Sequence, residues 1–461
     1  MTLPRSDALV FFGATGDLAY KKIFPALQAM IRRGHLDMPV IGVAMPDWSL
    51  DQFKARAKDS LEKHGGLDPT AYAKLCSRLD YVSGDYGNAA TFDKLHTALG
   101  TAKRPLYYLA IPPSLFAPVA EGLAKSETIK DARVVVEKPF GRDLASAEEL
   151  NRTLHAHFAE QAIFRIDHYL GKEPVQNLIY FRFANPMLEA SWNCESIESV
   201  QITMAEKFGV EGRGKFYEEA GAIRDVVQNH MLQVLACLAE ECPVGQDREV
   251  RRDERARVLK AVRTLKPSDV VRGQFRGYLR EPGVAPDSKV ETFAAIRFQI
   301  DNDRWKGVPF FIRVGKCLPV TTTEIKIRLK RQPRPVLDEL DSPLPNYFRF
   351  RLSPEMVVAL GTKVKKAGEL LVGERIEMIA RHQPPDEMEP YERLLGDAAN
   401  GDSTLFGRED SVEESWRIVD PILGNATPVY EYDPNTWGPP EVDRAFVPEG
   451  GWHNPQQEAP K

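Results

Sequence analysis

The sequence predicts two domains of different class: an α/β domain with a parallel sheet over residues 1–166, then a larger α+β domain with a mostly antiparallel sheet over residues 167–461. In the first region short apolar runs alternate with helical periodicity, which is typical of strands joined by crossover helices. Past residue 175 strand patterns follow one another with few helices between them, which indicates a large antiparallel sheet. A chain of 461 residues is also too long for one ordinary core.

The chain opens with a strand, a glycine turn and a helix. Residues 9–12 form an apolar run, Gly13-x-x-Gly16 follows, and the apolar face of the next helix carries Ile23, Leu27, Met30 and Ile31. This order is typical of the first unit of a Rossmann-type dinucleotide-binding domain. The glycines let the backbone approach a pyrophosphate, and Thr15 adds a hydroxyl and an N–H. The spacing is not Gly-x-Gly-x-x-Gly, so a plain strand-to-helix turn stays open as an alternative.

Five further strands complete the first domain, with helices over about 50–63 and 89–99; the strands are expected at 40–44, 79–82, 106–111, 133–136 and 163–166. The fifth strand of the domain delivers Glu137-Lys138-Pro139 at its carboxyl end, where ligands bind in such sheets. A surface lysine at a strand end is the alternative for Lys138. The helix over 145–158 carries His155 and His157, which do not share a face, so we expect solvated side chains and no metal ligation.

The second domain contains one long helix among many strands. Strands are expected at 200–204, 292–300, 310–314, 324–329, 347–352 and 356–360. The helix over 218–238 carries Asp225 and His230, about 140° apart around a regular helix, so they can only flank a ligand from two sides. A core histidine is the alternative for His230. The charged run 248–257 predicts a solvated helix, and the proline-rich run 332–345 an exposed loop.

Residues 165–174 combine an acid, a histidine, a lysine and a helix start. Pro174 fits the first position of a helix, where its missing N–H costs nothing. Gly171 and Lys172 then lie at the helix mouth, where free N–H groups and the dipole favour an anion. His168 and Lys172 add two donors, so a phosphate fits better than a metal. A capped helix with a surface ion pair is the alternative.

Composition narrows the range of functions. The net charge of −5 gives no broad attraction to nucleic acid or acidic membranes, so an anionic substrate needs a local basic pocket. The five cysteines are scattered without Cys-x-x-Cys, which suits reduced thiols in a cytoplasm. We find no signal peptide and no apolar run of the roughly 18 residues that a membrane span requires.

Five stretches, in order along the chain, resemble the glucose-6-phosphate dehydrogenase family: Gly13-Ala14-Thr15-Gly16-Asp17-Leu18 with Lys22, Val136-Glu137-Lys138-Pro139-Phe140-Gly141, the run 165–174, the run 221–230, and Gly307-Val308-Pro309-Phe310 through Gly315-Lys316. Each motif is modest, but the ordered set is specific. The resemblance implies oxidation of D-glucose 6-phosphate at C1 to 6-phospho-D-glucono-1,5-lactone with NAD(P)+, the first step of the oxidative pentose phosphate pathway. It also implies a homodimer or homotetramer built through the large sheet.

The same resemblance implies site residues. The C1 hydroxyl must lose a proton as hydride leaves, which requires a base of near-neutral pKa. His230 corresponds to that base and Asp167 to the carboxylate that orients it; no metal is needed. The substrate contacts correspond to His168, Lys172, Glu206, Asp225, Lys316 and Lys138. The cofactor contacts correspond to Gly13, Thr15, Gly16, Asp17, Leu18, Lys22, Met45 and Lys138.

Two positions depart from the family's pattern. Met45 stands where the NADP enzymes usually have arginine, and Asp47 lies two residues on, so we expect appreciable use of NAD beside NADP. Thr321 stands where the family usually has a second substrate cation, which predicts a weaker grip on substrate or compensation by Lys326 or Arg328.

Two alternatives remain at this point. Glu-Lys-Pro after a strand also occurs in the glucose–fructose and inositol dehydrogenase superfamily. The first alternative is therefore an NAD-preferring dehydrogenase of another sugar or sugar phosphate. The second alternative is a nicotinamide-binding regulator that has no catalytic activity.

Overall fold

The computed structural model describes residues 4–245, 247–331, 345–368, 370–381 and 387–457. The chain forms two compact units. The first unit extends to Lys172 and also takes in Pro243–Asp253 and Met388–Glu413. The second unit comprises Glu173–Cys242, Glu254–Glu387 and Glu414–Lys461. Most of the predicted proline-rich loop lies outside the described residues.

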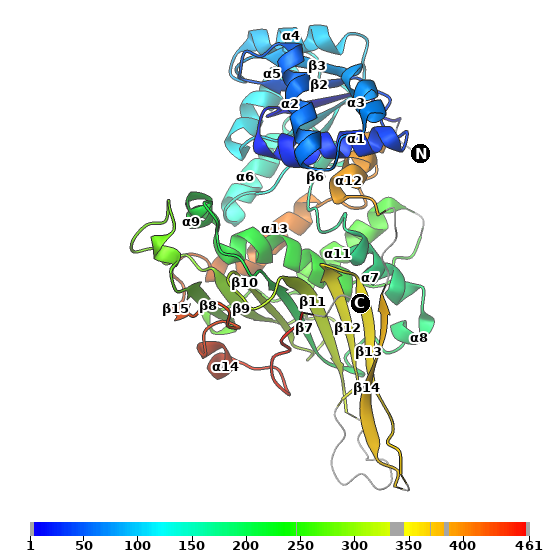
Figure 1. The fold of residues 1–461 in the computed structure, drawn as a ribbon, viewed down its shortest axis with the longest axis vertical. Coiled ribbons are helices and arrows are strands. Elements are labelled where there is room, and N and C mark those ends of the chain that lie inside the picture. The colour runs from blue at the N-terminus through cyan, green and yellow to red at the C-terminus, as the bar shows by residue number, and fades with distance from the viewer. Residues whose placement is uncertain (1–3, 246, 332–344, 369, 382–386, 458–461) are drawn as a thin grey trace. The chain divides into compact units, whose positions relative to one another are not determined.

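A six-stranded parallel sheet organises the first unit, in the order β3-β2-β1-β4-β5-β6. Its strands are β1 (Ala8–Phe12), β2 (Val40–Ala44), β3 (Leu79–Ser83), β4 (Pro105–Leu109), β5 (Arg133–Val136) and β6 (Ile163–Arg165). Residues of β1, β2, β4 and β5 are all buried, because helices cover both faces of the sheet (Figure 1). The predicted parallel α/β domain is therefore confirmed, and every predicted strand is found within about two residues.

Helices surround this sheet. They are η1 (Ala19–Ile23), α1 (Phe24–Arg32), α2 (Leu50–Lys63), α3 (Pro69–Cys76), α4 (Ala89–Leu99), η2 (Pro113–Leu115), α5 (Phe116–Lys125), α6 (Leu144–His155), η3 (Glu160–Ala162) and α12 (Pro390–Asn400). Ser49 caps α2, accepting a hydrogen bond from the Gln52 N–H at 3.2 Å, and the Gln52 side chain returns a bond to the Ser49 N–H. The sequence pattern did not predict α12, which belongs to the first unit although it follows β14 in the chain.

A nine-stranded sheet organises the second unit, in the order β14-β13-β12-β11-β7-β10-β9-β8-β15. Its strands are β7 (Ile197–Ala205), β8 (Val270–Phe275), β9 (Phe293–Phe298), β10 (Phe310–Gly315), β11 (Thr322–Leu329), β12 (Tyr347–Ser353), β13 (Val357–Lys365), β14 (Gly373–Arg381) and β15 (Val429–Tyr432). Neighbours are antiparallel except β7 with β10 and β8 with β15. The prediction of a mostly antiparallel sheet is confirmed, although it missed β8, β14 and β15.

The remaining helices are α7 (Glu173–Phe183), α8 (Pro186–Glu189), α9 (Gly214–Ala222), η4 (Ile223–Met231), α10 (Leu232–Ala239), α11 (Arg248–Ala261), η5 (Pro267–Asp269), η6 (Tyr278–Arg280), α13 (Glu409–Val419), η7 (Asp420–Ile422) and α14 (Glu441–Ala445). Within the second unit, α7 packs on β12 and α10 packs on α7 (Figure 1). Phe181 of α7 meets Phe350 edge-on at 5.6 Å. Alternate residues of a strand point to opposite faces, so the charged Arg349 lies on the other face of the sheet.

The C-terminal segment lies against that other face. The His453 backbone N–H donates to Gln201 at 2.8 Å, and its ring bonds Glu324 of β11 at 2.5 Å. Trp452 meets Phe311 edge-on at 5.7 Å. The described residues after about 436 therefore pack along the surface, as the sequence predicts.

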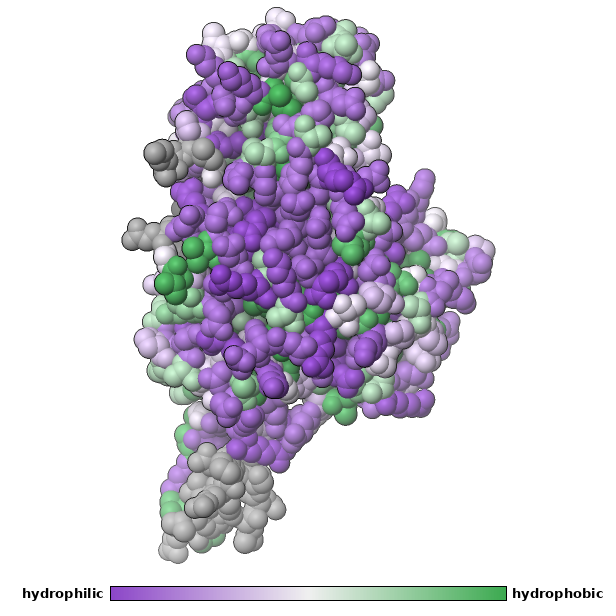
Figure 2. Space-filling model, turned by 180° about the vertical axis from the view of Figure 1, so that it is seen from behind, coloured by the Kyte–Doolittle hydropathy of each residue, from purple (hydrophilic) through white to green (hydrophobic). Residues whose placement is uncertain are grey.

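The rear surface is mostly hydrophilic, with hydrophobic side chains in small separate groups (Figure 2). Among the described residues, none of the helices has the length and apolar character needed to cross a bilayer.

The charged run 248–257 forms part of α11, as predicted, but its expected solvation is wrong. Arg252 is 1% exposed. Its guanidinium bonds Glu249 at 2.9 Å and Glu160 at 3.4 Å, within the first unit. A charged sequence pattern does not distinguish a solvated face from a face whose charges are paired inside the protein.

Candidate functional site

The glycine turn after β1 is held closely against the ends of the neighbouring strands. Gly13 has φ +79°, and a Cβ there would lie 2.2 Å from the carbonyl oxygen of Ala110. The Gly13 N–H donates to Val43 and to the hydroxyl of Tyr86, which in turn donates to Val43. Only glycine fits this close approach at positive φ. The turn therefore brings bare backbone to the carboxyl ends of β1 and β4, where a dinucleotide binds in such sheets.

The predicted cofactor residues around the turn are accessible. Thr15 and Leu18 are half-buried, and Gly16, Asp17 and Lys22 are exposed. Asp17 pairs with Lys21 of η1 at 3.0 Å, and this bond lowers the pKa of the Asp17 carboxyl. The helix that follows begins with the π-turn η1, which differs from the regular helix predicted there.

The end of β2 presents Met45, whose side chain is 64% exposed. Beyond it Trp48 stacks on Tyr81 of β3, with ring centroids 6.4 Å apart. The Tyr81 hydroxyl donates to the Pro46 carbonyl at 2.6 Å and fixes this loop. A flat aromatic surface and an exposed thioether thus lie where the sequence places the nucleotide's ribose end.

Glu137 and Lys138 follow β5 directly. The Tyr108 hydroxyl donates to Glu137 at 2.5 Å, and Tyr391 also bonds that carboxyl. Burial raises the pKa of Glu137 to about 7, against the opposing effect of these bonds and of Lys138. Lys138 is half-buried, and the Lys138–Pro139 bond is cis. The sequence did not single out Tyr391, because an aromatic residue at a distant helix start looks like core.

Asp167 opens the turn that precedes α7. Its carboxylate accepts the Tyr169 N–H at 3.0 Å and its carbonyl accepts the Leu170 N–H at 3.0 Å, so the backbone turns tightly here. The Lys172 ammonium lies 3.7 Å from the centre of the Tyr169 ring. His168 and Lys172 are both half-buried.

The structure brings three predicted residues of the first unit together. Burial lowers the pKa of Lys172, Asp167 opposes that effect, and Lys22 adds to it, so all three charges lie within electrostatic reach. Two lysines beside a helix start form the local positive region that a phosphate requires in a protein of net charge −5.

A second cluster lies in the second unit, at the ends of two neighbouring strands. β7 and β10 run parallel and end level, with Ala205 beside Gly315. Glu206 and Lys316 therefore follow the two strands side by side, and their side chains pair at 2.5 Å. The Lys316 backbone is fixed by the Thr292 carbonyl at 2.9 Å and the Tyr432 hydroxyl at 2.7 Å.

Asp225 joins this cluster through Tyr217. Burial raises the pKa of the Tyr217 hydroxyl well above its ordinary value, and the negative charges of Asp225 and Glu206, which lie within electrostatic reach, raise it further. Thus Glu206, Asp225 and Lys316, all predicted substrate residues, are brought together in the second unit. The sequence did not identify Tyr217, since a buried tyrosine on an apolar helix face carries no separate signal.

The predicted long helix over 218–238 is not regular, which corrects the angle expected between Asp225 and His230. Gly221 has φ +66° and ends α9 with a kink, and residues 223–231 form the π-helix η4. A π-helix bonds residue i to i+5, so residues five apart lie one turn above each other. Asp225 and His230 therefore lie on one side of η4, and His230 is only 3% exposed.

Thr321 has a structural contact in place of a charge. Its hydroxyl accepts the backbone N–H of Lys207 at 3.0 Å. The two residues suggested as substitutes for the second cation are engaged elsewhere: Lys326 contacts the His453 ring at 3.3 Å, and Arg328 bonds Glu198 and the Glu449 carbonyl.

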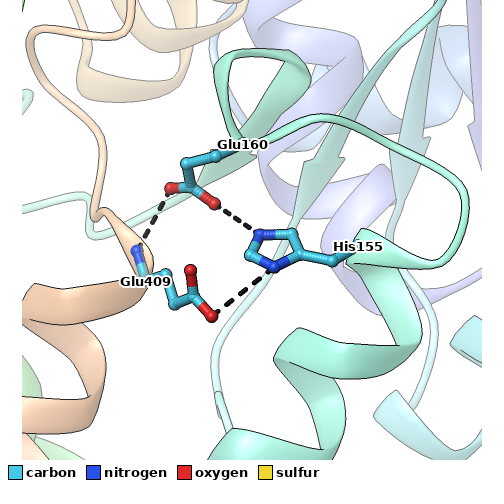
Figure 3. Close-up of side chains that lie close together, drawn as sticks. All are labelled: His155, Glu160 and Glu409. Atoms are coloured by element: carbon cyan, nitrogen blue, oxygen red, sulfur yellow. Dashed lines mark hydrogen bonds and ion pairs between the residues drawn. The ribbon is translucent and has the colours of Figure 1, made fainter.

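A third cluster, His155, Glu160 and Glu409, has atoms within 4.8 Å of one another, a spacing compatible with a metal (Figure 3). His155 bonds Glu160 at 2.9 Å and approaches Glu409 at 3.5 Å, so its predicted solvation is wrong. Each ring nitrogen faces a different carboxylate, and Arg165 binds both oxygens of Glu160 at 2.8 and 3.0 Å. A guanidinium on both oxygens opposes a metal, so we interpret the cluster as an ion-pair network.

Comparison with known proteins identifies the family. The model of "Glucose-6-phosphate dehydrogenase, NAD binding domain" matches residues 10–177 and that of the "C-terminal domain" matches residues 179–453. Glucose-6-phosphate 1-dehydrogenase 1 of Mycobacterium tuberculosis is 44% identical over 98% of this chain and 97% of its own.

Solved structures agree with this assignment. The crystal structure of glucose-6-phosphate 1-dehydrogenase from Mycobacterium avium is 44% identical, with a TM-score of 0.92 over 99% of this chain and 100% of that one. A glucose-6-phosphate dehydrogenase in complex with its substrate glucose-6-phosphate is 35% identical, with a TM-score of 0.91 over the same shares. The chain therefore belongs to the glucose-6-phosphate dehydrogenase family.

Proposed function

We propose that the protein oxidises D-glucose 6-phosphate at C1 to 6-phospho-D-glucono-1,5-lactone, with a nicotinamide dinucleotide as hydride acceptor. The observation that carries the proposal is the near full-length match, at 44% identity, to relatives named for this activity. The two side-chain clusters support it independently, since one suits a phosphate and the other suits sugar hydroxyls. The alternatives are oxidation of another sugar or sugar phosphate, and a catalytically silent nicotinamide-binding regulator.

In the first unit the proposal assigns the phosphate to His168 and Lys172. The Lys172 ammonium is partly withdrawn from water, with Lys22 adding positive charge nearby. Charge-assisted hydrogen bonds of this kind are about twice as strong as neutral ones. Lys138, half-buried at the end of β5, would reach both sugar and cofactor.

In the second unit the proposal assigns sugar hydroxyls to Glu206, Asp225 and Lys316. Carboxylates accept hydrogen bonds, and hydroxyls donate them, so two carboxylates suit neighbouring hydroxyls. The ammonium of Lys316, paired with Glu206 at 2.5 Å, donates to a hydroxyl oxygen.

His230 is proposed as the general base. It takes the proton of the C1 hydroxyl as the C1–H bond breaks and the C1=O bond forms. Asp167 would orient the imidazole and stabilise its protonated form, as the acid of a catalytic triad does. The low exposure of His230, 3%, keeps water from competing for that proton.

The dinucleotide site is proposed at the glycine turn. The positive φ of Gly13 and its close approach to the Ala110 carbonyl leave no space for a side chain, as in the glycine turns that approach a pyrophosphate. Thr15, Gly16, Asp17, Leu18, Lys22, Met45 and Lys138 would complete the site. The bound nicotinamide supplies the hydride acceptor.

We also propose appreciable use of NAD beside NADP. The exposed Met45 offers no charge to a 2′-phosphate, and Asp47 two residues on disfavours one. Steady-state kinetics with both cofactors test this. A preference for NADP above about a hundredfold, roughly 2.7 kcal/mol, would contradict it.

The absorbance of reduced nicotinamide tests the proposed function. We expect turnover with glucose 6-phosphate and either cofactor, and far weaker turnover with free glucose. Equal rates with free glucose would favour the dehydrogenase of another sugar. Cofactor binding by calorimetry without turnover would favour the silent regulator.

A homodimer or homotetramer is proposed, together with a cytoplasmic location. β14 is the terminal strand of the large sheet, and its Met378 and Ile379 are 51% and 42% exposed. An edge strand with exposed apolar residues is a pairing surface. Light scattering coupled to gel filtration should give at least twice the mass of 51.8 kDa; a stable monomer would contradict this. All five cysteines are free, as cytoplasmic thiols are.

A further inference from the structure

The ammonium of Lys316 lies between two aromatic rings. Its Nζ is 4.9 Å from the centre of the Phe208 ring and 5.7 Å from that of Tyr217. Both distances are within the range at which a cation is attracted to an aromatic face. The same ammonium pairs with Glu206 at 2.5 Å. Phe208 lies two residues beyond Glu206, and Tyr217 comes from α9.

The two rings differ in exposure. Tyr217 is 3% exposed and belongs to a core cluster, where it meets Tyr278 edge-on at 6.2 Å. Phe208 is 42% exposed, although it is a large apolar side chain. A phenylalanine that stays 42% exposed loses part of the stabilisation that full burial would give, so packing alone does not fully explain its place beside a buried ammonium.

Lys316 needs such support. It is 8% exposed, so the ammonium has lost most of its hydration. The attraction between the two charges of a buried ion pair offsets that loss only when their geometry is fixed. The faces of aromatic rings attract the ammonium electrostatically. Unlike a second hydrogen-bond donor, a ring does not compete with Lys316 for the Glu206 carboxylate.

We propose that Phe208 and Tyr217 form an aromatic clamp that holds the Lys316 ammonium in position for a sugar hydroxyl. They are positioning residues, which act through Lys316. The clamp rests on the proposed function, in which Lys316 and Glu206 bind the sugar. Tyr217 is fixed by the core, and Phe208 closes the clamp from the solvent side.

Phe208→Leu is the decisive variant, because replacing a half-exposed residue leaves the fold intact. We expect KM for glucose 6-phosphate to rise about 3- to 30-fold. We expect kcat to change less than about threefold and KM for the dinucleotide to stay unchanged. Tyr217→Leu should raise KM for glucose 6-phosphate by a similar factor. Tyr217→Phe, which keeps the ring, should have a KM within about threefold of the wild-type value.

A double-variant cycle tests whether Phe208 acts through Lys316. In a Lys316→Met background, Phe208→Leu should change KM less than about twofold. An equal rise in both backgrounds would overturn the clamp, as would a Tyr217→Phe variant as impaired as Tyr217→Leu. Phe216→Leu is the matched control: Phe216 is 39% exposed and faces Arg213 at 4.5 Å, so it should leave KM unchanged.

A measurement without turnover separates the clamp from the proposed function. Lysines carrying ¹³C-dimethyl groups report ring currents by NMR, and the Lys316 signal is assigned by its loss in Lys316→Met. An upfield shift of that signal that disappears in Phe208→Leu supports the clamp even if no sugar is oxidised. A Lys316 signal at the position of exposed lysines would overturn it.

Discussion

The proposed phosphate site makes its sharpest prediction at Lys172. Its ammonium lies 3.7 Å from the centre of the Tyr169 ring, and burial lowers its pKa. Methionine keeps the length of the side chain and its contact with the ring but removes the charge. Lys172→Met therefore isolates the charge from the packing.

The magnitude follows from the surroundings of the ammonium. A hydrogen bond to a charged group contributes about 1.5–3 kcal/mol. This corresponds to a rise of about 10- to 150-fold in KM for glucose 6-phosphate. We expect kcat to fall less, because the phosphate is remote from C1.

Initial rates over a range of glucose 6-phosphate and of free glucose measure the effect. The preference of the wild type for the phosphorylated sugar should collapse in Lys172→Met, while activity on glucose stays unchanged. Lys21→Met is the control, since Lys21 is exposed and pairs with Asp17 at 3.0 Å. An unchanged KM in Lys172→Met would refute the phosphate site.

Three other variants test separate parts of the structure. Gly13→Ala sets a Cβ 2.2 Å from the Ala110 carbonyl, so it should lower stability by about 1–3 kcal/mol and abolish dinucleotide binding; calorimetric affinity within threefold of wild type would contradict this. Burial raises the pKa of Glu137 to about 7, so the folded state holds this proton more tightly than the unfolded state does. The free energy of unfolding measured with urea should therefore fall by about 1–3 kcal/mol between pH 4.5 and pH 8. Glu137→Gln should remove this pH dependence. Burial lowers the pKa of His453, so protonation favours release of the C-terminal segment as the pH falls through 6.5. Carboxypeptidase should therefore remove residues of this segment faster at pH 5.5 than at pH 7.5, and equal rates would contradict this effect of protonation.

The strands of the first unit could be predicted almost completely from sequence. A strand covered on both faces reads as an unbroken apolar run, and 40–44 and 133–136 match β2 and β5 residue for residue. The strands that were missed lack that signal. β14 is an edge strand in which every residue is at least partly exposed, and β8 interrupts its apolar pattern with Arg272 and Gly273.

The sequence names candidate site residues but does not predict how their side chains are arranged in space. Periodicity assigns a helix near Asp225 and His230 but does not distinguish α from π bonding, which decides whether the two share a side. Aromatic residues such as Tyr217 look like core in sequence, and only the structure shows the charges around them. Similarly, His155 reads as solvated because Glu409, its second partner, is far along the chain.

The measurement that tests the proposed chemistry most directly is kcat of His230→Asn. Asparagine keeps a polar side chain of similar reach but cannot act as a base near neutral pH. We expect kcat to fall by about 10² to 10⁴, with an unchanged circular dichroism spectrum and melting temperature. A variant that keeps more than half of the wild-type rate would remove His230 from the role of base.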